Sequence, residues 1–73
     1  MSSHVQAIIV PKEYYTEKQA HYWVKKNGFK PIKRVHSSPS FWRFRIKEPN
    51  EQVYNYRLVK FGSYIKAVIG FEK

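Results

Sequence analysis

The segment FWRFRIK, residues 41–47, constrains the fold more than any other part of the chain, because large apolar side chains alternate with cations along it. Side chains of a strand alternate between the two faces of a sheet. One face would therefore carry Trp42, Phe44 and Ile46, and the other Phe41, Arg43, Arg45 and Lys47. Burial of the first face stabilises by about 1.5–3 kcal/mol per side chain, whereas burial of unpaired cations is prohibitive. We predict a strand with its apolar face toward the core and its cations toward solvent.

The core must stabilise this fold without covalent help. The chain has 73 residues and no cysteine, which excludes disulfides, thiolate zinc sites and cysteine nucleophiles. A chain of this length buries only about 60% of its unfolded surface. Aromatic residues, 18% of the total, supply the large apolar areas that a small core needs. We expect one soluble domain over residues 1–73, with neither a signal peptide nor a membrane-spanning segment.

One helix is predicted from its end signals. Thr16 followed by Gln19 fits a capping box, and Gly28 fits a left-handed stop, so we predict a helix from Glu17 to Asn27. Its predicted inner face comprises Ala20, Trp23, Val24 and Asn27. We expect Trp23 to anchor the helix on a sheet.

Five strands are predicted around this helix. The first lies in HVQAIIVPK, residues 4–12, and its apolar run at residues 7–10 favours a central place in the sheet. The others are expected over residues 30–36, 41–47, 53–61 and 64–71, with Gly62-Ser63 as a two-residue hairpin loop. The element order β-α-β-β-β-β predicts an α+β fold, one helix packed on a largely antiparallel sheet. The order of the strands stays open.

The charge of the chain is regional. It carries 14 Lys and Arg against 5 acidic residues, a formal net charge of +9. Nine of these cations lie between Lys18 and Lys47, an interval without any acidic residue. A surface adapted only for solubility usually mixes the two signs. This imbalance favours a polyanionic partner.

The leading hypothesis is binding of nucleic acid, with DNA as the first candidate and the choice between DNA and RNA open, through phosphate contacts that read no sequence. The guanidinium groups of Arg43 and Arg45 would grip phosphate oxygens, and lysines near the helix end would add diffuse attraction. If the strands form a meander, Arg57 or Lys66 could lie beside them. The predicted binding residues are Lys25, Lys26, Lys30, Lys33, Arg34, Arg43, Arg45, Lys47 and Arg57.

The alternative is a structural or protein-interaction module. Alternation of arginine with aromatics is typical of any half-exposed strand. One helix covers one face of a sheet, so Val59, Phe61 and Val68 would need cover from a terminus or another chain. A homodimer or an acidic partner protein could provide that cover, and both hypotheses could hold together.

Catalysis and metal binding have little support in the sequence. His4, His21 and His36 are widely separated, with no cysteine or aspartate to join them in a metal site. Ser37, Ser38 and Ser40 near His36 fit a turn better than a nucleophile. The carboxylates Glu48 and Glu51 flank a polar turn without an apolar pocket to raise their pKa. We expect no enzymatic activity, no cofactor and no metal.

Four blocks together carry a family resemblance: VQAIIVPK, AHYWVKKNGFKPIK, FWRFRI and YRLVKFGSYIKAVIGF. They resemble a small basic protein of large double-stranded DNA viruses of the marseillevirus kind, and a similar module in tailed-phage proteins associated with prohead proteases. The matching positions, such as Trp23, Gly28 and Phe29, are structural. The resemblance implies a virion-associated protein that acts in genome packing or early infection and is located in the virion and the host-cell cytoplasm or nucleus. For the alternative function, it implies a virion structural module with an acidic viral protein as a partner. It supplies no catalytic residue.

Overall fold

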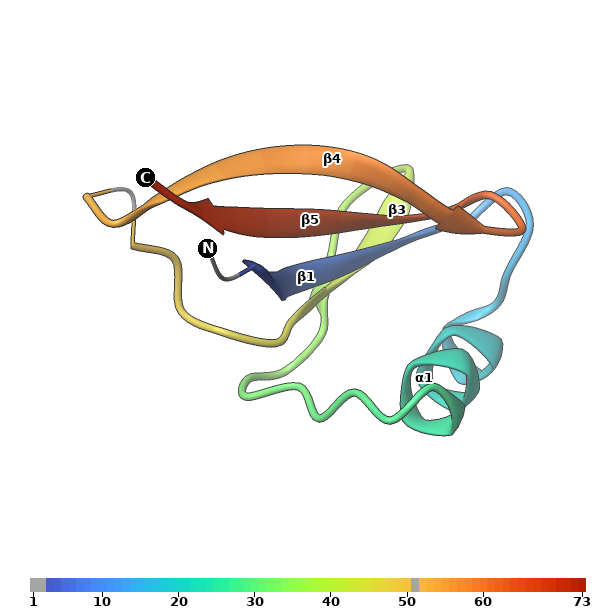
Figure 1. The fold of residues 1–73 in the computed structure, drawn as a ribbon. Helices are drawn as coiled ribbons and strands as arrows, with labels where there is room; N and C mark the ends of the chain where they lie inside the picture. Colours follow the sequence, from blue (N-terminus) through green and yellow to red (C-terminus); the bar gives the residue numbers. More distant parts are fainter. Residues whose placement is uncertain (1–2, 51) are drawn as a thin grey trace.

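The computed structural model describes residues 3–50 and 52–73, which form one helix and five strands (Figure 1). The elements are β1 (Ser3–Pro11), α1 (Glu17–Lys26), β2 (His36–Ser37), β3 (Phe41–Arg45), β4 (Tyr54–Gly62) and β5 (Ile65–Glu72). The predicted α+β class and the β-α-β-β-β-β order of elements are confirmed.

All five strands belong to one antiparallel sheet in the order β2-β3-β1-β5-β4. The first strand lies in the centre of the sheet, as its apolar run predicts, and Ala7, Ile8 and Val10 are completely buried. The sheet is not a meander, because β1 separates β3 from β5. This arrangement decides which charged side chains meet.

The helix forms where its end signals predict. The Thr16 N–H donates to Gln19 Oε1 at 2.8 Å, and the Gln19 N–H donates to Thr16 Oγ1 at 3.2 Å. At the other end Gly28 has a φ of +82°, and the Phe29 N–H donates to the Val24 carbonyl at 3.1 Å. These bonds satisfy backbone groups that a helix end leaves free, and an N-cap of this kind stabilises by about 1 kcal/mol.

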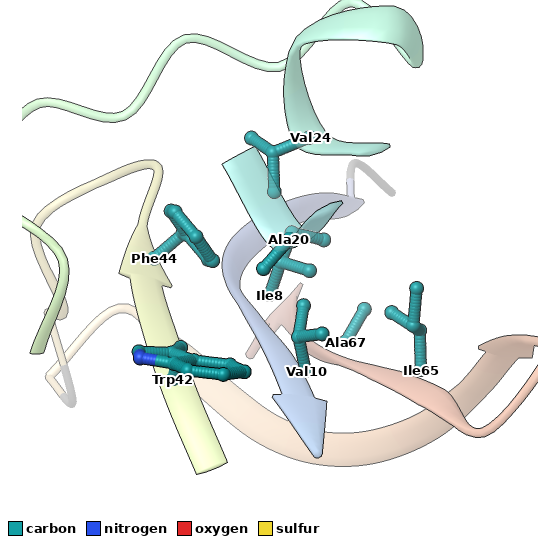
Figure 2. Close-up of a cluster of buried hydrophobic side chains, with 8 residues drawn as sticks. All are labelled: Ile8, Val10, Ala20, Val24, Trp42, Phe44, Ile65 and Ala67. Carbon is teal, nitrogen blue, oxygen red and sulfur yellow. The ribbon is translucent and has the colours of Figure 1, made fainter. Parts of the chain in front are cut away.

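The core lies between α1 and one face of the sheet. Ala20 and Val24 of the helix face a layer of sheet side chains, seen in Figure 2: Ile8, Val10, Trp42, Phe44, Ile65 and Ala67. The predicted inward direction of Trp42 and Phe44 is therefore confirmed. Trp23 packs at the margin of this core, with its ring centroid 5.8 Å from that of Phe61. Part of the cover that Phe61 needs thus comes from the same chain.

The predicted strand over residues 30–36 is wrong for most of its length, since only His36–Ser37 pairs with β3. Pro31 has no amide hydrogen for a ladder. The Ile32 N–H donates to the Arg45 carbonyl at 2.9 Å, while the Ile32 side chain is exposed. The segment therefore crosses the end of β3 as a loop. Burial in the sheet would not stabilise the basic side chains of this segment.

The hairpin between β4 and β5 is displaced by one residue from its predicted position. Gly62 pairs with Ile65, so the two-residue loop is Ser63-Tyr64. The pairing shifts between Lys60 and Gly62, and Gly62 uses its φ of +137° within the strand end. Tyr64 instead occupies the left-handed region at a φ of +69°. For a residue with a side chain this conformation costs about 1–3 kcal/mol.

Candidate nucleic-acid interface

The sheet face turned away from α1, here called the open face, carries a row of basic side chains. Residues paired across antiparallel strands share a face. Arg43 pairs with both His36 and Ile9, Ile9 pairs with Lys66, and Lys66 pairs with Lys60. This cation row crosses five strands, a span of about 19 Å at ordinary strand spacing. Ile9 is its one apolar position.

At one end of the cation row the surface is hollowed. The basic hollow has a volume of about 270 Å³ and is lined by Lys33, Arg34, His36, Arg43 and Arg45. Two of these residues belong to β3, one to β2 and two to the preceding loop. The hydrogen bond between Ile32 and Arg45 holds that loop beside β3. Each lining residue is basic, so the hollow suits an anion.

One carboxylate reaches the basic hollow. Glu48 lies 3.0 Å from Lys33 Nζ and 3.8 Å from Arg45 Nη1. The hydrogen bond from Lys33 lowers the pKa of Glu48, with further lowering from the charges of Lys33 and Arg45. All three side chains are substantially exposed, and exposed ion pairs are weak. Glu48 therefore competes with an incoming anion without blocking the hollow.

A buried glutamine positions Arg43. Gln6 lies where the pairing of β1 with β5 shifts, and its side chain is almost completely buried. Gln6 Nε2 donates to the Lys47 carbonyl at 3.0 Å, and Gln6 Oε1 accepts from Arg43 Nη2 at 3.5 Å. Sequence reasoning missed Gln6, although a polar residue inside an apolar run was the available signal. Gln6 thus restrains Nη2 of the guanidinium, while Arg43 Nε is buried without a hydrogen-bond partner among the described residues.

The structure brings together four of the nine predicted binding residues, Lys33, Arg34, Arg43 and Arg45. Lys25 and Lys30 line a separate hollow of about 360 Å³ at the end of the helix. Lys26 Nζ lies 5.7 Å from the centre of the Tyr22 ring. These three lysines belong to a different part of the surface.

The other two predicted residues divide between the faces. Lys47 lies on the open face, with its Nζ 5.4 Å from the centre of the Tyr54 ring. Arg57 pairs with Ile69, on the face that α1 covers, and its guanidinium carbon lies 6.0 Å from the Phe71 ring centre. The expectation that Arg57 could join Arg43 is therefore wrong. Lys66, the other candidate neighbour, does share the cation row.

Aromatic side chains close the far end of the open face. The His4 ring centroid lies 4.5 Å from that of Tyr54 and 6.4 Å from that of Tyr56. His4 Nε2 is buried without a hydrogen-bond partner among the described residues. Burial lowers the pKa of His4, and the nearby charge of Lys47 lowers it further. This cluster favours a neutral imidazole and offers an anion little.

Within residues 3–50 and 52–73, no group of three or more His, Asp or Glu side chains is placed to hold a metal ion. The expected carboxylate of Glu51 lies outside this described part. No helix among the same residues is long and apolar enough to cross a membrane. Comparisons with family models, curated proteins and solved structures find no match to the chain. The viral resemblance therefore stays a prediction.

Proposed function

We propose that the protein binds nucleic acid, with DNA as the first candidate, through phosphate contacts on its open face. The observation that supports this most is the basic hollow, where all lining residues are basic and Glu48 is the competing carboxylate among residues 3–50 and 52–73. Phosphate oxygens suit the planar guanidinium fork, which Arg43 and Arg45 offer from alternate positions of one strand. Backbone phosphates carry no sequence information, so we propose binding that does not depend on sequence.

The cation row would extend the contact beyond the hollow. Lys66 lies two strands away from Arg43, about 10 Å at ordinary strand spacing. Each neutralised phosphate releases counterions, which lowers the logarithm of the affinity by about 0.9 per tenfold increase in salt. Contact of the four cations of the hollow and Lys66 with about five phosphates would give a slope of roughly −4.5.

Fluorescence anisotropy with labelled double- and single-stranded DNA over a salt series tests this proposal. The test variant is Arg43→Ala/Arg45→Ala, and the matched control is Lys25→Ala/Lys26→Ala, which removes the same charge from the helix end. We expect the arginine variant to lose about tenfold or more in affinity and about two units of salt slope, and the control to lose less.

Two results would count against the proposal. Equal losses in both variants would indicate diffuse attraction without a site in the basic hollow. Absence of binding at low salt would remove nucleic acid as the partner. Roles in viral genome packing or early infection, within the virion or the host cell, suit a small basic protein, but their support is the family resemblance.

A second candidate function is self-association through β4. This strand of nine residues is an edge of the sheet, with β5 as its neighbour, and it lies at the outer limit of the fold in Figure 1. Leu58, Val59 and Phe61 along it are exposed. An edge strand presents free backbone groups on which another strand can pair. The specific support is thus a long apolar edge.

A homodimer with two antiparallel β4 strands fits the side chains of this edge. With Leu58 opposite its own copy, Tyr56 would face Lys60 of the second copy, and Arg57 would face Val59. No two cations would be directly opposed, which avoids a destabilising pair. Apolar burial is not screened by salt, so such a dimer would persist at high ionic strength.

Sedimentation velocity at high salt tests self-association. We expect a concentration-dependent dimer for the wild-type chain and a monomer for Leu58→Lys, because the substitution places two charges opposite each other. The control Ile32→Lys alters an exposed apolar residue of the loop before β2. A wild-type chain that stays monomeric at high concentration rules this candidate out. An acidic viral protein could then be the partner of this edge.

A further inference from the structure

Tyr64 occupies an unfavourable conformation without the compensation of burial. Its φ of +69° lies in the left-handed region, which favours glycine. The side chain is nevertheless 66% exposed, so it contributes little to the core. Strained residues of this kind concentrate at functional sites. The position calls for a reason why a large aromatic ring is retained there.

Neighbouring residues hold Tyr64 in place. Its ring stacks on that of Tyr14, with centroids 3.9 Å apart and planes inclined by 11°. The adjacent Ser63 carbonyl accepts a hydrogen bond from the Tyr15 hydroxyl at 2.7 Å. The chain after β1 thus braces the hairpin loop from outside the sheet. The result is an exposed aromatic pair on a fixed support.

Tyr64 also borders open space in two hollows. One, of about 500 Å³, is lined by Tyr14, Tyr64, Lys60 and Lys66 among others. The second, of about 590 Å³, includes Tyr64, Lys66 and the half-buried Phe41, and the carboxylate-bearing Glu13 also lines it. Each hollow combines an aromatic ring with at least one lysine. This combination suits a ligand that has both a flat ring and a negative charge.

The two lysines of this region stand directly opposite each other. Lys60 and Lys66 are paired across β4 and β5 on the open face. Like charges at directly opposed positions destabilise a strand pair. Neither lysine forms an ion pair with an acidic residue in the described ranges 3–50 and 52–73. An anion bound between them would remove this repulsion.

We propose that Tyr14, Tyr64, Lys60 and Lys66 form a hairpin site for an unpaired nucleotide. The base of this nucleotide stacks on the Tyr14–Tyr64 pair, and its phosphate lies between Lys60 and Lys66. The preferred ligand of the protein is then single-stranded nucleic acid, because bases inside a duplex do not present their faces. This inference rests on the proposed nucleic-acid function and narrows its ligand class.

The hairpin site is continuous with the basic hollow. The cation row ends on one side at Lys60 of β4, beside Lys66 of β5, and on the other at His36 of β2, beside Arg43 of β3. A strand that follows the row would place phosphates in the hollow at one end and a base on Tyr64 at the other. Aromatic rings beside a basic groove are the usual means of binding single strands without sequence preference.

Two labelled probes of the same length, an oligothymidylate of about 12 nucleotides and its abasic backbone analogue, separate stacking from charge. Both probes carry the same phosphates, and only the first carries bases. We expect the oligothymidylate to bind about tenfold more tightly in anisotropy titrations at one salt concentration. This comparison uses the wild-type chain and does not depend on the folding of any variant.

Substitutions at position 64 then locate the effect. Tyr64→Gly removes the ring, and glycine readily adopts the positive φ at this position. In thermal unfolding, Tyr64→Gly should therefore be at least as stable as Tyr64→Ala. We expect Tyr64→Gly to lose the advantage of oligothymidylate over the abasic probe, and Tyr64→Phe to keep it. Lys60→Ala/Lys66→Ala should lower the affinity for both probes by the same factor.

The outcomes separate this inference from the function on which it rests. Equal binding of the two wild-type probes overturns base stacking and leaves phosphate binding intact. If Tyr64→Gly still binds oligothymidylate more tightly than the abasic probe, the bases stack elsewhere and the hairpin site is overturned. Failure of both probes to bind at low salt overturns the proposed function itself.

Discussion

The two faces of the sheet differ in chemistry, although the same strands form both: one face is apolar and buried, and the other carries cations that are partly exposed. On the side of α1, Phe44 and Ile8 are completely buried and pack against the helix. On the open face, the neighbouring Arg43 and Arg45 of β3 are only partly buried and line the basic hollow. Figure 2 shows the first face as a continuous layer of apolar side chains between strands and helix. In the described part of the chain, residues 3–50 and 52–73, no helix covers the second face.

This difference separates what folds the chain from what the chain can bind. Apolar burial drives folding, so the residues facing α1 are constrained in size and shape. The cations of the open face add little burial and, as at Lys60 and Lys66, even repel each other. Changes on the open face should therefore alter binding while the fold persists. Changes to the buried side chains of the covered face should unfold the protein.

The largest expected effect is that of Phe44→Ala on the covered face. Loss of a fully buried phenylalanine costs about 3–5 kcal/mol, which is comparable with the whole stability of a chain this small. Urea unfolding followed by circular dichroism should show a midpoint shifted far downward or no folded state. The matched change Arg45→Ala, one residue along β3, should shift the midpoint little. Similar shifts for both variants would abolish the distinction between the faces.

Local signals explain how much of the fold the sequence predicts. The capping box at Thr16 and the stop at Gly28 depend on neighbouring residues, and they predict α1 correctly. Alternation predicts the two faces of β3 for the same reason. The strand order depends on pairing between distant segments, which no local pattern encodes. The hairpin loop was misplaced by one residue because Gly62 fits both a loop and the end of β4.

The candidate site shows the same limit. Arg43 and Arg45 were predicted to share a face, and they do. Their grouping with Lys33 and Arg34 follows from a loop that the sequence suggested would be a strand. Lys60 was missed because its place in the cation row follows only from the register of β4 with β5. Pairing between strands, more than composition, therefore determines this interface.

Gly70→Ala should give the second largest effect, this time through the open face. A Cβ at position 70 would lie 2.7 Å from His4 Cε1 and 2.8 Å from Tyr56 Cε1. The Tyr56 hydroxyl accepts a hydrogen bond from the Asn50 N–H at 2.6 Å, which hinders its withdrawal. We expect a loss of about 1–3 kcal/mol in the free energy of unfolding.

A loss of this size would mean that the aromatic end of the open face stabilises the fold, unlike the basic hollow. Urea unfolding of Gly70→Ala is compared with that of Gly70→Ala/His4→Ala, in which the crowded ring is absent. We expect the second substitution to remove part of the cost of the first. An unchanged midpoint for Gly70→Ala would show that this end of the open face is as tolerant as the basic hollow.

Glu48→Gln should have a smaller effect and one of opposite sign on binding. The carboxylate interacts with Lys33 and Arg45 in the basic hollow, and the amide of glutamine carries no charge. We expect affinity for DNA to rise by about two- to fivefold in anisotropy titrations. Glu17→Gln, at the start of α1, removes the same charge and interacts with His21 instead. Equal gains in both variants would argue for net charge alone.

The smallest expected effect is a dependence of stability on pH through His4. Burial, reinforced by Lys47, lowers the pKa of His4 below its ordinary value of 6.5 in the folded chain. The unfolded chain therefore binds more protons at pH values below 6.5, and stability must fall as the pH decreases through the interval between the two pKa values. His4→Gln cannot titrate, so its urea midpoint should change less across this interval. A decline of the same size in both proteins would assign the pH dependence to other groups and leave the aromatic end of the open face indifferent to protonation.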